Sequence, residues 1–131
     1  MRSERATLAQ AAIVLDALGA GRAWRHGRRG EPFGIASPVE LPLAVEVVVW
    51  GSAVSAPVAM DIVLGALVPA WGRGEPAAAR MVRGLGWLRL VGTLSEPLTW
   101  RRRPWPDVGL SAAHLLLASL LIRRSRARSG A

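Results

Sequence analysis

The run VVVWGSAVSAPVAMDIVLGALVPAW, Val47–Trp71, contains twenty-five residues and a single charge, Asp61. A helix needs roughly 17–25 apolar residues to cross the hydrocarbon core of a bilayer, which is about 30 Å thick. A chain of 131 residues has few other residues that could cover such a run in water. The run therefore predicts a membrane helix. Its carboxylate then needs a partner, because a charge at the bilayer centre costs roughly 2.5–3.5 kcal/mol.

Three further segments approach the same length, and charged loops rich in glycine and proline separate them. The sequence predicts an all-α fold, a small integral membrane bundle of about four transmembrane helices in a single domain, 1–131. The third and fourth segments are short, so three or even two true spans also fit. The second is longer than a straight span needs, and we expect it to tilt or to begin at the interface near Pro42. The predicted spans are 6–24, 41–71, 82–100 and 106–122.

The basic residues support a membrane environment. All 17 are arginines, the net charge is +8, and they cluster between the apolar segments. We expect them to contact anionic lipid headgroups, and we expect no nucleic-acid partner, because they flank apolar segments and do not line one folded face. The composition is typical of a GC-rich bacterial gene. The clusters are Arg22–Arg29, Arg73–Arg83, Arg101–Arg103 and Arg123–Arg128.

The positions of the tryptophans and of the loop charges indicate where the protein lies in the cell and how it is oriented in the membrane. Four of the six tryptophans fall at predicted segment ends, where indoles prefer the headgroup level. Nine arginines on the side of the termini against seven on the other favour cytoplasmic termini in a multi-pass plasma-membrane protein. Residues 6–24 are predicted to be a retained helix and not a cleaved signal, because Asp16 interrupts their apolar stretch. The four tryptophans are Trp24, Trp71, Trp100 and Trp105.

Every predicted span carries ionisable groups, which we expect to form a polar seam inside the bundle. Glu46 and Asp61 would lie on one stripe of a single helix, about 22 Å apart along its axis. Arg89 would lie about 10 Å from Glu96 along the third span. The seam candidates are Asp16, Glu46, Asp61, Arg89, Glu96 and His114.

Small and polar residues recur at helical spacing on two spans, which favours close helix packing in lipid. One such stripe contains Asp107, Ser111, His114 and Ala118, and another contains Ala9, Ala12, Asp16 and Ala20.

Three functions fit this pattern. In the first, the seam assembles the bundle, a homo-oligomer or a larger membrane complex. In the second, a proton-coupled or anion-handling carrier, Asp61 and His114 exchange protons and Arg89 holds an anion. In the third, a membrane enzyme acts on a lipid or isoprenoid substrate, with Asp61 or Glu96 as acid and His114 as base. No catalytic motif selects the enzyme.

Other classes find little support. The chain has no cysteine and two histidines, so the sequence predicts neither a metal site nor a cofactor. A soluble four-helix domain is the competing fold, and it would have to bury the whole run Val47–Trp71.

Overall fold

The computed structural model describes residues 2–27, 29, 39–51, 55–96 and 104–126. This part of the chain contains five α-helices and no strand, which confirms the predicted all-α class. The helices are α1 Arg2–Arg25, α2 Leu43–Val49, α3 Val58–Gly72, α4 Pro76–Ser95 and α5 Trp105–Arg124.

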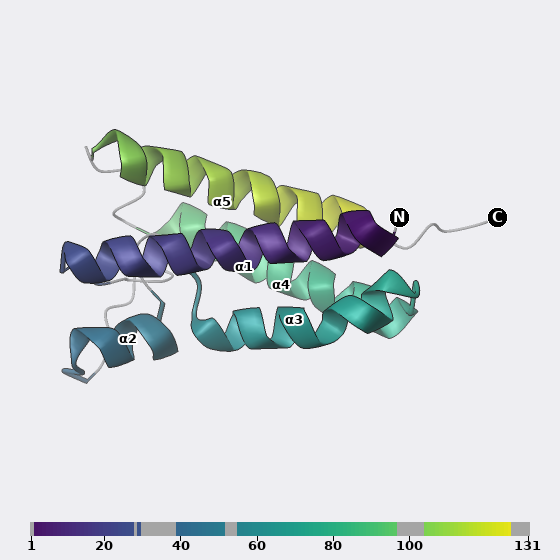
Figure 1. Cartoon of the computed structure of the whole chain (residues 1–131), viewed down its shortest axis with the longest axis horizontal. Helices are drawn as coiled ribbons and strands as arrows, with labels where there is room; N and C mark the ends of the chain where they lie inside the picture. Colours follow the sequence, from purple (N-terminus) through teal and green to yellow (C-terminus); the bar gives the residue numbers. More distant parts are fainter. Residues whose placement is uncertain (1, 28, 30–38, 52–54, 97–103, 127–131) are drawn as a thin grey trace.

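The four longer helices form a ring. Helix α1 packs against α3 and α5, and α4 packs against the same two helices. Figure 1 shows α1 running between α5 and α3, with α4 behind them and the short α2 beside the C-terminal end of α1. The beginning of α1 and the end of α5 lie at the same end of the molecule (Figure 1). The inward faces of four helices therefore meet in one interior.

Prolines begin four of the five helices. Pro42, Pro57 and Pro104 precede α2, α3 and α5, and Pro76 is the first residue of α4. Proline has no N–H to leave unpaired in the first turn, and its restricted φ angle suits a helix start. Proline is thus compatible with each of these four starts, of which the sequence predicts the one near Pro42 and, to within one residue, that of α5.

The long apolar segment 41–71 is not one helix. It forms α2 and α3, and the described residues between them are non-helical. Gly51 has a φ of 84°, and a Cβ there would lie 2.8 Å from the carbonyl oxygen of Ser55. The prediction of a single stripe from Glu46 to Asp61 is therefore wrong, because this left-handed turn separates the two acids onto different helices.

Other boundaries also differ from the prediction, and α4 ends at Ser95, five residues before the predicted end of the third span. Helix α4 begins at Pro76, six residues before the predicted Val82, because three alanines with high helix propensity follow the proline. Helix α1 begins at Arg2, before the predicted start of the first span. Trp100, predicted at the end of the third span, lies outside the described residues.

Within the described residues, one helix is long and apolar enough to cross a membrane, namely α5. Helix α3 is apolar but has only 15 residues, which span about 22 Å. Helices α1 and α4 carry arginines near their ends or along their length. Length and composition of the helices therefore do not establish the predicted four spans.

The hydrophobic core gathers near the end that holds the start of α1 and the end of α5. Trp71 is fully buried there, and the guanidinium of Arg5 lies 5.6 Å from the centre of its ring. The prediction that Trp71 sits at a headgroup interface is wrong, because small side chains from α1 and α4 leave room for its indole inside. Those side chains are Ala9, Ala12, Ala78 and Ala79.

Candidate functional site

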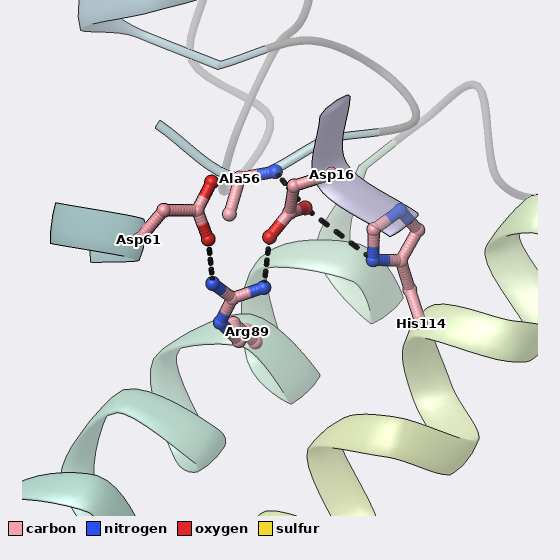
Figure 2. A network of polar contacts seen from close by, with 5 residues as sticks. All are labelled: Asp16, Ala56, Asp61, Arg89 and His114. Atoms are coloured by element: carbon pink, nitrogen blue, oxygen red, sulfur yellow. Dashed lines mark hydrogen bonds and ion pairs between the residues drawn. The ribbon is translucent and has the colours of Figure 1, made fainter. Parts of the chain in front are cut away.

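Four ionisable side chains meet in the interior of the helix ring, one from each longer helix. They are Asp16 of α1, Asp61 of α3, Arg89 of α4 and His114 of α5, and we call them the central cluster (Figure 2). Three of them are buried, and the side chain of Asp61 retains 13% of its exposure. The cluster lies where the inward faces of all four helices converge.

Arg89 connects three helices through its two terminal nitrogens. Its Nη1 donates a hydrogen bond to Asp16 Oδ2, and its Nη2 donates one to Asp61 Oδ1 at 2.5 Å. Figure 2 shows the guanidinium between the two carboxylates. Charge-assisted bonds of this kind are roughly twice as strong as neutral ones, so Arg89 ties α4 to both α1 and α3.

The second oxygen of Asp16 serves two further elements. Asp16 Oδ1 accepts a hydrogen bond from the backbone N–H of Ala56 at 2.8 Å, and it lies 3.5 Å from His114 Nδ1. Ala56 belongs to the non-helical segment before α3, where the N–H has no partner within a helix. Asp16 therefore accepts a hydrogen bond from a backbone N–H that has no helical partner because the apolar segment is interrupted there.

The central cluster holds more acid than base. Asp16 and Asp61 bring two negative charges against the single positive charge of Arg89, so the cluster has a net charge of −1 while His114 is neutral. A buried ion cluster is most stable when its charges balance, because each uncompensated charge carries a large desolvation cost. One added proton, on a carboxylate or on the imidazole, brings the net charge to zero.

Two more ion pairs involve buried carboxylates. The fully buried Asp107, near the start of α5, accepts a hydrogen bond from Nε of Arg22 in α1. The buried Glu46 of α2 accepts one from Nη1 of Arg29. Both arginines are more exposed than their acidic partners, so each pair connects the interior to the surface.

The structure brings together four of the six seam candidates and places the other two elsewhere. Glu46 lies in α2 with Arg29 as its partner. Glu96 is buried at the C-terminal cap of α4, two turns beyond Arg89. The seam is therefore not one continuous row of charges.

Sequence reasoning missed two features of this interior. The sequence pattern places Asp107 on a stripe of small and polar residues, but the seam candidates do not include it. Its position seven residues before His114, on the same helix face, was the available signal. The backbone N–H of Ala56 had no signal, because it becomes available only where the helix breaks.

Large apolar side chains cover the outside of the bundle beside the central cluster. Leu18, two residues after Asp16, is 62% exposed, and Ile62, directly after Asp61, is 68% exposed. Leu88, directly before Arg89, is 53% exposed, and Leu116, two residues after His114, is 61% exposed. On all four helices, the ionisable residue faces inward and a large apolar neighbour faces outward.

Comparison with models of protein families, with curated proteins and with solved structures gives no match for this chain.

Proposed function

We propose that this chain is an integral membrane protein and that the central cluster assembles its helices into a bundle. The observation that carries this proposal is the polarity of the four longer helices, each of which turns an ionisable residue inward and a large apolar residue outward at the same level. In water, burying charge and exposing leucine or isoleucine are both unfavourable. In lipid, the same arrangement is favourable, because polar groups need partners and the outward faces meet hydrocarbon.

The helix break supports this environment. Non-helical backbone at membrane depth is tolerated where protein surrounds it and satisfies its polar groups. Gly51 and Ser55 are buried, and the N–H of Ala56 donates a hydrogen bond to Asp16. In this proposal α2, the break and α3 cross the bilayer together as one discontinuous helix, while α1, α4 and α5 cross singly.

The orientation follows from the charges at the two ends. In this proposal the protein is a multi-pass plasma-membrane protein with both termini in the cytoplasm. The start of α1 and the end of α5 share one end of the bundle (Figure 1), and exposed arginines of α5 lie there. Both ends carry arginines, and the nine on the side of the termini outnumber the seven on the other side, which favours cytoplasmic termini. A bundle held together in this way fits an accessory or scaffolding subunit of a larger membrane complex.

The chain contains no cysteine, so single cysteines report on its surroundings without background. We expect Leu18→Cys, Ile62→Cys and Leu116→Cys to resist a membrane-impermeant maleimide in sealed vesicles and to react after denaturation. Ser3→Cys, near the start of α1, should react from one side of the membrane. Alkaline carbonate should leave the protein in the vesicle pellet.

Release by carbonate, or rapid labelling of Ile62→Cys in sealed vesicles, would overturn the membrane proposal. To test assembly, the helices are cross-linked in pairs in vesicles that carry Arg89→Gln. Normal cross-linking in that variant between α3 and α4, which pack against each other and are joined by Arg89 and Asp61, would contradict the role of the central cluster in assembly.

The acid excess in the central cluster favours a second candidate, a proton-coupled carrier. A buried site with a net charge of −1 gains stability by taking up one proton. It also lies beside a discontinuous helix, a feature of ion and substrate sites in transporters. Proteoliposomes should then take up protons in response to a pH gradient, and Asp61→Asn should abolish this uptake. Unchanged uptake in both Asp61→Asn and His114→Gln would remove the candidate.

A further inference from the structure

A groove lies between the first turns of α1 and the last turn of α5. Its volume is about 810 Å³, which falls within the roughly 300–1,000 Å³ typical of small-ligand sites. One part of its lining is apolar and contains Leu8, Ala11 and Leu120. These three residues lie on the bundle side of the groove, one to three turns from the helix ends.

The other part of the lining is cationic. Four arginines and one glutamate line it, which leaves three uncompensated positive charges. Arg124 Nη1 lies 3.6 Å from Glu4 Oε2, so this pair is loosely formed on the surface. The arginines are Arg5, Arg123, Arg124 and Arg126.

The four arginines have different roles. Arg5 is held in place, because its Nη1 donates to the carbonyl oxygen of Trp71 and its guanidinium stacks over that indole. Arg123 and Arg126 are exposed and make no ion pair with a carboxylate in the part of the chain that the structure describes. They therefore have guanidinium groups ready for an external anion.

We propose that this groove binds the phosphate headgroup of an anionic phospholipid, with the acyl chains leaving along Leu8, Ala11 and Leu120. The proposal rests on the membrane function proposed above, because only a bundle in a bilayer has its helix ends at headgroup level. It assigns one defined lipid site, which is more specific than general attraction of arginines to the membrane surface.

Three properties of the groove fit this ligand. The planar guanidinium group presents paired donors that match phosphate oxygens. The N–H groups in the first turn of α1, which have no acceptor within their own helix, add partial positive charge on the same side. The apolar lining begins directly beside the cations, in the order in which a phospholipid presents its headgroup and its chains.

The test compares two double variants with the same loss of charge. Arg123→Gln/Arg126→Gln removes the free cations of the groove, and Arg25→Gln/Arg80→Gln removes two exposed arginines outside its lining. Each full-length protein is placed in nanodiscs of phosphatidylcholine and titrated with phosphatidylglycerol, and bound lipid is counted by native mass spectrometry. We expect the groove variant to bind phosphatidylglycerol roughly 30-fold more weakly than wild type, and the control to bind it normally.

Equal weakening in the two double variants would overturn the groove, because it would show attraction to net charge alone. Displacement of the lipid by inorganic phosphate or glycerol phosphate would assign the site to a free phosphate and overturn the lipid. Carbonate extraction of the same proteins separates the two proposals. A protein that stays in the membrane but shows no difference between the variants contradicts the groove only, whereas release of wild type contradicts the membrane function.

Discussion

Arg89 donates hydrogen bonds to two aspartates from different helices, Asp16, which is 73 residues away in sequence, and Asp61, which is 28 residues away. These bonds join α1, α3 and α4, and the contact between Asp16 and His114 adds α5. A guanidinium can do this because its two terminal nitrogens point in fixed and separate directions. The stability of the helix ring should therefore depend on Arg89 more than on any exposed arginine.

Arg89→Gln should lower the free energy of unfolding by about 3–5 kcal/mol, because it leaves two buried carboxylates without a cation. The measurement is unfolding in detergent micelles with increasing dodecyl sulfate, followed by circular dichroism. Arg80→Gln is the matched control, since Arg80 is exposed on the same helix. A loss in Arg89→Gln no larger than in Arg80→Gln would contradict the structural importance of the central cluster.

Removing the charges of the central cluster together should be milder than removing one. The triple variant Asp16→Asn/Asp61→Asn/Arg89→Gln should recover most of the stability lost in Arg89→Gln, because no unpaired charge remains. Asparagine at position 16 also keeps an oxygen that can accept the N–H of Ala56. The same unfolding measurement decides this, and a triple variant less stable than the single one would show that the ion pairs themselves are indispensable.

The Arg22–Asp107 pair should respond asymmetrically. Asp107 is fully buried, whereas the side chain of Arg22 retains 24% of its exposure. Arg22→Gln should therefore cost up to about 3 kcal/mol, because a fully buried carboxylate loses the cation that donates a hydrogen bond to it. Asp107→Asn should cost only about 1 kcal/mol, because the partly exposed Arg22 can turn toward solvent. Thermal unfolding of the two variants and of the double variant gives the coupling energy. Equal losses would contradict the difference in burial.

Gly86 and Gly84 provide a matched pair on α4. A Cβ on Gly86 would lie 2.9 Å from Ile122 Cγ1 and 3.2 Å from the carbonyl oxygen of Ala118, whereas nothing lies within 4 Å of a Cβ on Gly84. Gly86→Ala should separate α4 from α5 and destabilise the protein by about 1–3 kcal/mol. Gly84→Ala should stabilise it by up to about 1 kcal/mol through helix propensity. If the melting temperatures of Gly86→Ala and Gly84→Ala shifted in the same direction, the close packing of α4 against α5 at Gly86 would be contradicted.

The turn at Gly51 should also be intolerant of a side chain. Its φ of 84° is costly for other residues, and a Cβ would collide with the Ser55 carbonyl oxygen at 2.8 Å. We expect Gly51→Ala to lower the free energy of unfolding by about 1–3 kcal/mol. Gly21→Ala, in the open part of α1, should raise it by about 0.5–1 kcal/mol. Unfolding in dodecyl sulfate measures both, and a neutral Gly51→Ala would mean that the break between α2 and α3 has another cause.

Part of the interior can be read from single helices. Asp16, Asp61, Arg89 and His114 stand out in the sequence because each is an ionisable residue in a long apolar or small-residue segment. The same reasoning selects Glu46 and Glu96 as well. It identifies charged residues in apolar segments, but it does not identify the residues that contact them. Helical periodicity gives the face of the helix on which a residue lies, but not how that helix is rotated relative to the neighbouring helices.

The sequence by itself determined the helical class, a helix start near Pro42, the start of α5 to within one residue, and the positions in apolar segments at which charges require partners. These properties depend on neighbouring residues within one or two turns. Only the tertiary structure decided that Arg89 lies between Asp16 and Asp61. It also decided that the apolar segment breaks after Gly51, and that Asp16 compensates the break at Ala56. Those outcomes depend on how four helices are placed against one another, because a buried hydrogen bond forms only where donor and acceptor from distant segments meet.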